Sequence, residues 1–385
     1  MTKFLKRIFL FLIPILIFTG VPAYLFLRTG ENFISESRIR KLQKSGAGDY
    51  LIGYYYNESN YRALKKISIE ELATNDVMML GSSRVTQFRD FMFEKPFFNC
   101  GYTVSTITQV ANYLESMPEK KIPNVLFLGL DQWMFNENWD PVDFHAYTDF
   151  FDPKSVKIAY EPNPKQFLSL WIDLLESKFP LKGDSESENL STKKIIGINA
   201  NFYQMGFRPD GSFYYGDRIK GLLKSDPSVK DFGFHDTYER IKKGVFRFEY
   251  GEQVNPKALR AIEDLIDFCK EKKIKLVIFL PPFAPSVVQK LQNSGNHQYI
   301  QKLPELLSKY AINDEVEIWD FTNIEMLESD DKEFLDGFHA SEVSDLRILI
   351  HMVENNSLLG DYTDLEEMKN LLNFRKNELE LKSDD

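Results

Sequence analysis

The longest apolar stretch of the sequence lies close to its N-terminus. It runs from Ile8 to Leu27, twenty residues without a charged side chain. A helix of that length spans the ~30 Å hydrocarbon layer of a membrane. Membrane helices also tolerate interruptions such as Pro14 and Pro22 better than soluble helices do. The pattern therefore predicts a membrane-spanning helix within residues 1–28.

Basic residues flank this run on both sides, so their count does not decide its orientation. A short basic leader is typical of a secretory signal, and Val21-Pro22-Ala23 has the small residues of a cleavage site. Because the apolar run continues to Leu27, we favour an uncleaved signal anchor over a cleaved signal peptide. We expect a single-pass protein of the cytoplasmic membrane, with most of the chain in the periplasm or at the cell surface.

Beyond residue 75, short apolar runs alternate with segments of helical spacing. The short runs are typical of buried strands, and the longer segments place their apolar residues on one helix face. We therefore predict strands at 77–80, 97–98, 125–130, 275–280 and 316–319, and helices at 106–116, 256–272, 286–309 and 341–355.

Strands that alternate with helices favour an α/β fold with a parallel sheet covered on both faces. In such sheets, functional side chains collect at the carboxyl ends of the strands. Here those ends are Gly81-Ser82-Ser83, Asn99-Cys100-Gly101, Gly129-Leu130-Asp131 and Pro281-Pro282. We therefore expect the functional site at this edge of the sheet.

The alternation is absent from three other parts of the chain. Residues 29–75 are polar and predict a partly helical stalk. Residues 132–254, rich in aromatic, Asn, Asp and Gly residues, predict a large insertion in the 76–355 domain. Either a substrate-binding lid or structural decoration is consistent with that composition. Residues 356–385 are highly charged and predict a C-terminal helix.

Composition narrows the classes of partner and ligand. Asp and Glu outnumber Lys and Arg by 57 to 47, and the net charge is −10. A nucleic-acid binder normally carries a basic face, so we expect no nucleic-acid partner. Cys100 and Cys269 are the only cysteines and form neither a zinc nor a redox spacing. We therefore expect neither a metal nor a cofactor.

Two short motifs carry the residue types of nucleophilic catalysis. A Gly-Ser-Ser-Arg motif at 81–84 follows a predicted strand, and an Asp-Gly-Phe-His motif at 336–339 precedes a predicted helix. A serine hydroxyl needs an imidazole as general base, and the imidazole needs an orienting carboxylate. We therefore assign these roles to Ser83, His339 and Asp336. Each motif alone is weak, since Gly-Ser-Ser after a strand is usually a turn with a helix cap.

The order of the motifs carries more information than either motif. Strand–G-x-S, then N-x-G, then strand–G-x-D, then D-x-x-H before the last helix resembles the block order of the SGNH, or GDSL-like, hydrolase superfamily. The similarity covers 76–131 and 255–355. It implies a three-layer, flavodoxin-like sandwich, with Ser83 as nucleophile and Asp336 and His339 completing a triad. It also implies an oxyanion hole formed by the backbone amides of Ser83 and Gly101.

The sequence departs from this superfamily at the third block. Asp131 stands where the family has an Asn that donates to the oxyanion. An ionised carboxylate cannot donate, and losing one such donor costs about 10²–10³ in rate. A fast, generic esterase is therefore disfavoured, and a specialised transferase, or a site completed by a partner, fits better. Arg84, beside the nucleophile, is a candidate for binding an anionic substrate group, with a solvated helix start as the alternative.

One subgroup combines an N-terminal anchor, a G-S-S block and a late D-x-x-H, as this chain does. It comprises proteins of cell-envelope acylation, such as the D-alanyl transfer protein of teichoic acid operons and alginate O-acetylation proteins. These work beside a multi-span membrane-bound O-acyltransferase. The resemblance implies a serine-dependent O-acyltransferase or esterase acting on a cell-envelope polysaccharide, with acetyl the expected acyl group. A non-catalytic assembly or glycan-binding factor and a secreted carbohydrate esterase remain as alternatives.

Overall fold

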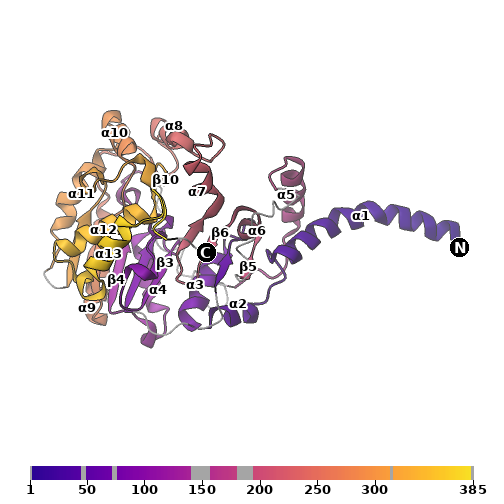
Figure 1. Cartoon of the computed structure of the whole chain (residues 1–385), viewed down its shortest axis with the longest axis horizontal. Helices are drawn as coiled ribbons and strands as arrows, with labels where there is room; N and C mark the ends of the chain where they lie inside the picture. The colour runs from indigo at the N-terminus through magenta and orange to yellow at the C-terminus, as the bar shows by residue number, and fades with distance from the viewer. Residues whose placement is uncertain are drawn as a thin grey trace.

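The predicted apolar runs form one five-stranded parallel sheet (Figure 1). The computed structural model describes residues 2–44, 49–71, 76–139, 157–179, 194–312 and 315–382. The strands lie side by side in the order β3-β2-β4-β8-β9. Every residue of the first three strands along the chain is buried, as expected for a parallel sheet covered on both faces. The strands are β2 (Val77–Gly81), β3 (Phe97–Gly101), β4 (Val125–Gly129), β8 (Lys275–Leu280) and β9 (Val316–Asp320).

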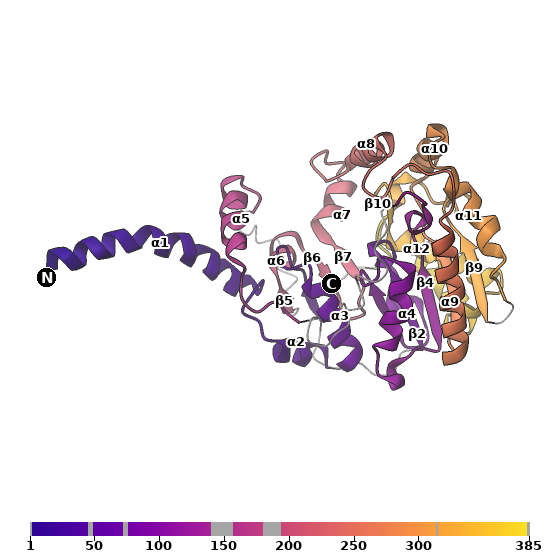
Figure 2. The same ribbon diagram turned by 180° about the vertical axis from the view of Figure 1, so that it is seen from behind.

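Helices cover both faces of this sheet. The pair α4 (Ile107–Glu115) and α9 (Pro256–Lys272) lies on one face (Figure 2), and α12 (Glu342–Glu354) with α13 (Leu365–Asn373) lies on the other (Figure 1). The predicted helix at 286–309 is two helices, α10 (Pro285–Ser294) and α11 (Gln298–Ser308). The prediction of an α/β fold around a parallel sheet is therefore confirmed.

The described residues between 29 and 71 pack into the domain and do not form a stalk. Their helices α2 (Glu36–Gln43) and α3 (Asn60–Glu71) flank strand β1 (Tyr50–Ile52). This strand pairs with segments of the insertion in a second sheet, of order β5-β1-β6-β7. The stalk prediction was wrong because strands that pair with β1 come much later in the chain. They are β5 (Lys194–Ile196) and β6 (Met205–Phe207), with β7 (Phe213–Tyr215) at the edge.

The described residues of the insertion also form the helices α5 (Pro164–Leu175), α6 (Ile198–Tyr203), α7 (Gly216–Leu223) and α8 (His235–Lys243). Its residues 140–156 and 180–193 lie outside the described residues. A buried lysine joins the two sheets: Lys65 Nζ donates to the Asn99 carbonyl at 2.6 Å and to the Gly211 carbonyl. Burial lowers the pKa of Lys65 to about 7.

The predicted C-terminal helix over 356–385 is mostly absent. Among the described residues of this segment only α13 is α-helical, preceded by a 3₁₀ turn at Leu358–Tyr362. Leu379 and Leu381, farther along the tail, are buried. The tail therefore packs onto the domain instead of extending as a charged helix, because its few apolar residues find cover there. Residues 383–385 lie outside the described part of the chain.

Helix α1 (Thr2–Thr29) projects from the rest of the molecule (Figures 1 and 2). Its segment Lys6–Thr29 contains an 18-residue stretch with a mean hydropathy of 2.3 and is long and apolar enough to be a membrane anchor or a signal sequence. Where α1 joins the domain, the buried Glu31 carboxylate accepts hydrogen bonds from four backbone amides, those of Tyr55, Tyr56, Asn57 and Ile198. We refer to this arrangement as the Glu31 clasp.

Candidate active site

Ser83 lies in the turn that follows β2. Gly81 ends the strand at a φ of +152°, and a Cβ there would lie 2.9 Å from the Gly129 carbonyl oxygen, so the position requires glycine. Ser82 caps the 3₁₀ turn that follows, because its Oγ accepts from the Arg84 N–H at 3.2 Å. The Ser82 hydroxyl is thereby directed into the protein, whereas that of Ser83 faces His339.

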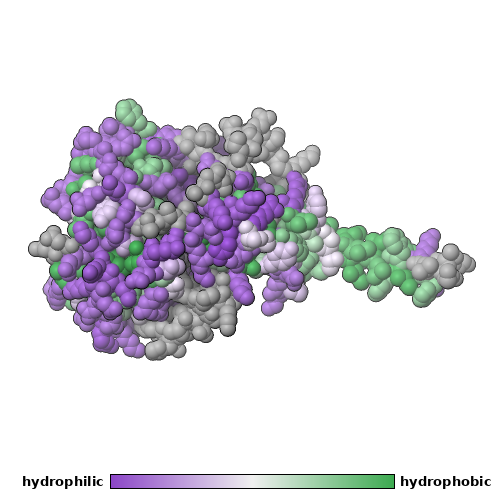
Figure 3. Space-filling model, turned by 90° about the horizontal axis from the view of Figure 1, so that it is seen from below, coloured by the Kyte–Doolittle hydropathy of each residue, from purple (hydrophilic) through white to green (hydrophobic). Residues whose placement is uncertain are grey.

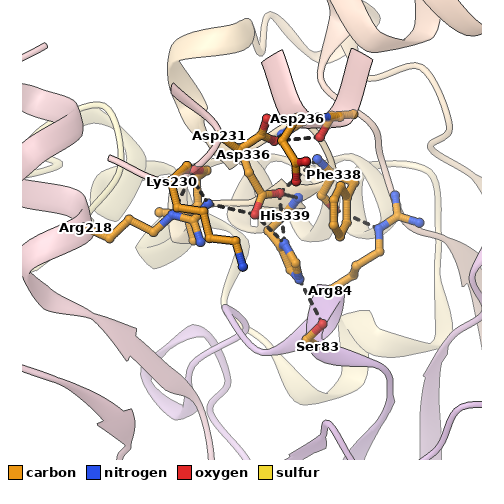
Figure 4. Close-up of polar contacts among 12 residues, drawn as sticks. Ser83, Arg84, Arg218, Lys230, Asp231, Asp236, Asp336, Phe338 and His339 are labelled. Atoms are coloured by element: carbon orange, nitrogen blue, oxygen red, sulfur yellow. Dashed lines mark hydrogen bonds and ion pairs between the residues drawn. The ribbon is translucent and has the colours of Figure 1, made fainter. Parts of the chain in front are cut away.

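Three side chains from two distant segments meet at this turn (Figure 4). Ser83 Oγ lies 2.8 Å from His339 Nε2. His339 Nδ1 lies 2.9 and 2.8 Å from the two carboxylate oxygens of Asp336. Asp336 ends strand β10 (Phe334–Asp336) and His339 begins β11 (His339–Ala340), so a tight hairpin turn sets their spacing. The structure therefore brings together the serine, histidine and aspartate that the sequence motifs single out.

The electrostatics of the turn suit a base that is held in one tautomer. Burial alone would raise the pKa of Asp336, but His339, Arg218 and the Phe338 N–H lower it well below its usual range. The carboxylate is therefore ionised at neutral pH and accepts the Nδ1 proton of His339. That leaves Nε2 as the acceptor for the Ser83 hydroxyl.

Arg218, from α7 of the insertion, is a site residue that the sequence analysis missed. Its Nη2 lies 2.9 Å from Asp336 Oδ2, and its Nε donates to the Leu335 carbonyl at 3.2 Å. The side chain is only 14% exposed. Nothing in the local sequence distinguishes Arg218 from a surface arginine, because its partner is set by how the insertion folds back over the sheet edge.

A second contact from the insertion supports the same hairpin turn. The Gly337 N–H donates to Asp231 Oδ2 at 3.3 Å, and Asp231 also accepts from Thr237. A Cβ on Gly337 would lie 2.6 Å from Thr237 Cγ2, so glycine is needed for this close approach. Of the two roles left open for the insertion, it therefore has at least a structural one: it braces the loop that carries Asp336 and His339.

Gly101 is not free to act as an oxyanion donor. Its N–H donates to Asn99 Oδ1 at 2.8 Å. Asn99 is itself held, since its side-chain amide donates to the carbonyls of Val85 and Phe88 at 2.8 and 2.9 Å. The expectation that Gly101 supplies a backbone donor is therefore wrong for this state of the protein. The Ser83 amide remains as a donor, because it begins a helical turn and has no acceptor within that turn.

Arg84 and Asp131 form a buried ion pair. Their side chains are 0% and 1% exposed, and Arg84 Nη1 lies 3.2 Å from Asp131 Oδ1. Four other acceptors complete the surroundings of the guanidinium: Gln132 Oε1 and the carbonyls of Pro281, Pro282 and Phe338. Burial raises the pKa of Asp131, and the charge of Arg84 opposes that shift.

This pair corrects two expectations. Arg84 neither binds substrate nor begins a solvated helix, because every one of these contacts is internal. The Asp131 carboxylate, in place of an oxyanion-donating Asn, faces Arg84, which balances its charge. The sequence shows both residues but not their pairing, since the motifs place them on the ends of two different strands.

No family model and no curated protein matches this chain. The functional inference therefore depends on the geometry of the site. Both cysteines, Cys100 and Cys269, are free and buried, and neither belongs to the triad. Within the described ranges, no group of three or more His, Cys, Asp or Glu side chains is arranged to hold a metal ion.

Proposed function

We propose that this protein is a serine-dependent O-acyltransferase or esterase that acts on a cell-envelope polysaccharide. The observation that carries the proposal is the chain of contacts from Ser83 Oγ through His339 to Asp336. Unrelated acyl-transfer enzymes share that geometry, and the inward-facing Arg218–Asp336 ion pair keeps the carboxylate ionised.

The reaction that this geometry supports has two steps. Ser83 Oγ attacks the acyl carbonyl of a donor while its proton passes to His339 Nε2, and His339 then returns the proton to the departing donor oxygen. The acyl group is left as an ester on Ser83. A sugar hydroxyl, or water in the esterase variant, next attacks that ester and gives its own proton to His339. The tetrahedral intermediate formed by this attack then loses its bond to Ser83 Oγ. His339 returns the same proton to that oxygen, which restores the Ser83 hydroxyl.

The arrangement of the sheet is consistent with the superfamily that the motifs suggest. Numbered along the chain, the five parallel strands lie in the order 2-1-3-4-5. This is the flavodoxin-like order of doubly wound folds. Together with the motifs at 81–84 and 336–339, it supports a three-layer SGNH-type sandwich in which the insertion forms part of the site.

The proposed location is outside the cytoplasmic membrane, with α1 as a single-pass anchor. Supporting it are the apolar length of α1 and the resemblance to envelope acylation proteins. In that setting, a multi-span membrane-bound O-acyltransferase is the proposed source of the acyl group. The polysaccharide would receive it outside the membrane.

The decisive experiment compares two neighbouring serines in a strain that lacks the native gene. We expect Ser83→Ala to abolish acylation of the envelope glycan and labelling by a fluorophosphonate probe, at an unchanged level of the protein in membranes. Ser82→Ala is the matched control and should retain the labelling, because its hydroxyl caps a turn. Full acylation in the Ser83→Ala strain would refute the covalent mechanism.

A second candidate is a non-catalytic assembly or glycan-binding factor on the same scaffold. It is favoured by the oxyanion site, where the Gly101 amide donates to Asn99 and Asp131 pairs with Arg84. Each missing donor costs about 10²–10³ in rate. A wild-type protein that fluorophosphonate never labels, in membranes or in detergent, would support this candidate over the enzyme.

A further inference from the structure

Helix α5 carries an apolar stripe on its outer face. Leu168, Ile172 and Leu175 are 55%, 45% and 81% exposed, and Trp171 lies among them. The spacing of these four residues, i, i+3, i+4 and i+7, places them on one side of the helix. The other side buries Leu170 in a small apolar cluster. Scattered exposed apolar residues are ordinary, but a continuous stripe marks an interaction surface.

Trp171 connects this stripe to α1 at one particular backbone group. The Trp171 Nε1–H donates to the Phe18 carbonyl at 2.8 Å. In an α-helix that carbonyl would accept from the residue four positions later, which is Pro22 and has no N–H. The two rings, of Phe18 and Trp171, also stack with centroids 6.4 Å apart. Trp171 thus satisfies the carbonyl that Pro22 leaves without a donor, a group that is costly to expose to lipid.

The stripe is continuous with the apolar surface of α1. The exposed side chains of α1 include Phe11, Leu16 and Ile17, and Figure 3 shows this helix as a hydrophobic projection from a largely hydrophilic body. A second contact, with the rings of Phe26 and Phe167 5.8 Å apart, fixes α5 against the same helix closer to the domain. The medium that surrounds α1 near Phe18, whether water or lipid, therefore also surrounds the α5 stripe.

We propose that α5 is an interfacial helix, and that its stripe lies among the acyl chains at the outer boundary of the bilayer. This inference rests on the proposed membrane location of α1, and not on the acyl-transfer chemistry. At 1.5 Å per residue, the charge-free run Ile8–Leu27 is ~29 Å long, about the thickness of the ~30 Å hydrocarbon layer. Helix α5 contacts this run at Phe18 and Phe26, in the half nearer the domain, which is the half that would face the outer boundary.

This placement also bears on signal cleavage. A cut after Ala23 would remove Phe18, the acceptor of the Trp171 indole, and would leave the α5 stripe facing water. The contact between Trp171 and the carbonyl opposite Pro22 therefore favours an α1 that is retained.

The test uses nitroxide spin labels on the full chain, reconstituted in phosphatidylcholine–phosphatidylglycerol vesicles. The native cysteines are buried, so labels go to Leu175→Cys on α5, Phe11→Cys on α1 and Phe374→Cys at the far end of the domain. Relaxation by oxygen reports lipid, and relaxation by a nickel chelate reports water. We expect the oxygen-to-nickel ratio at 175 to approach that at 11 and to exceed that at 374 several-fold.

Each other outcome refutes the placement of α5 in a distinct way. A label at 175 that behaves as the one at 374, while 11 reads lipid, leaves the anchor intact and overturns the α5 inference alone. Labels at both 11 and 175 that report water refute the membrane location of α1, and the α5 inference with it. Shielding of 175 from both relaxants indicates that protein covers the stripe. Trp171→Phe, which keeps the ring but loses the N–H, should move the label at 175 toward water.

Discussion

Asp131→Asn separates what the sequence predicts from what the structure predicts. Seen as a sequence, the substitution restores the oxyanion-donating Asn of the superfamily and should raise the rate of acyl transfer. In the structure, the side chain at 131 faces Arg84 and not the Ser83 hydroxyl. We therefore expect no gain in activity, and a loss of stability instead, because the substitution leaves a buried guanidinium without its counter-charge.

The size of that loss follows from the geometry. Two unit charges 3.2 Å apart attract by about 5 kcal/mol at an effective dielectric constant near 20. Because the Asn oxygen still accepts from Arg84, the expected net loss is about 3 kcal/mol, at the lower end for breaking a buried pair. With an unfolding entropy of ~2 cal/mol/K per residue over ~300 residues, the thermal midpoint should fall by about 5 °C.

The assay measures the thermal midpoint of the detergent-solubilised full chain by intrinsic fluorescence, with fluorophosphonate labelling rate as the readout of Ser83. Asp345→Asn is the matched control. Asp345 is buried, and neither of its carboxyl oxygens has a hydrogen-bond partner among the described residues. Burial raises its pKa well above the usual value, and no ion pair joins it to another described residue, so this substitution breaks no buried ion pair. An Asp131→Asn protein with an unchanged midpoint and faster labelling would refute the reasoning.

Two further predictions follow from the charges around the site. Arg218→Gln should lower the acylation rate about tenfold, in line with ~1.5 kcal/mol for one charge-assisted hydrogen bond. It should also move the acid limb of the pH–activity profile to higher pH, because Asp336 loses a cation that lowers its pKa. Arg218→Lys should restore part of the rate and part of the pH shift. An unchanged profile would contradict the role of Arg218 in keeping Asp336 ionised. Lys65, with a pKa of about 7 when folded, is neutral in the folded state and protonated in the unfolded state between pH 7 and ~10.4. Stability should therefore rise with pH across that window by up to ~1.4 kcal/mol per unit. Lys65→Met should flatten the rise in thermal midpoint, and an equal slope in both proteins would contradict the assignment.

The central sheet was predictable because most of its strands are buried on both faces. Runs such as Val77–Gly81 and Val125–Gly129 are apolar at every position, and that pattern needs no partner to be recognised. The second sheet was not predictable in the same way. Its strand Tyr50–Ile52 is three residues long, and its partners lie in the insertion. Short strands acquire their identity from pairing, which the local pattern does not contain.

The residues of the candidate site also differ in whether the local sequence identifies them. Ser83, Asp336 and His339 were found because the chemistry demands those residue types next to strand ends and turns. Arg218 was missed, and Arg84 was misassigned, because the roles of both arginines depend on which carboxylate they meet after folding. A guanidinium looks the same in a sequence whether it meets substrate, solvent or a buried partner.

The Glu31 clasp determines how the domain moves relative to α1, the proposed membrane anchor. Four amides converging on one carboxylate make the junction a rigid joint and not a flexible tether. Tilting α1 therefore tilts the whole domain with it, whereas rotation of the proposed anchor about the membrane normal keeps Ser83 at a constant height above the lipid. In the proposed reaction, a glycan chain comes to that height, and an acyl donor within the membrane reaches the domain by lateral diffusion alone. In the proposed reaction, the rigid joint thus confines the encounter between the acyl donor and the domain to two dimensions. A flexible glycine–serine insertion after Thr29 would remove that confinement while leaving the triad intact.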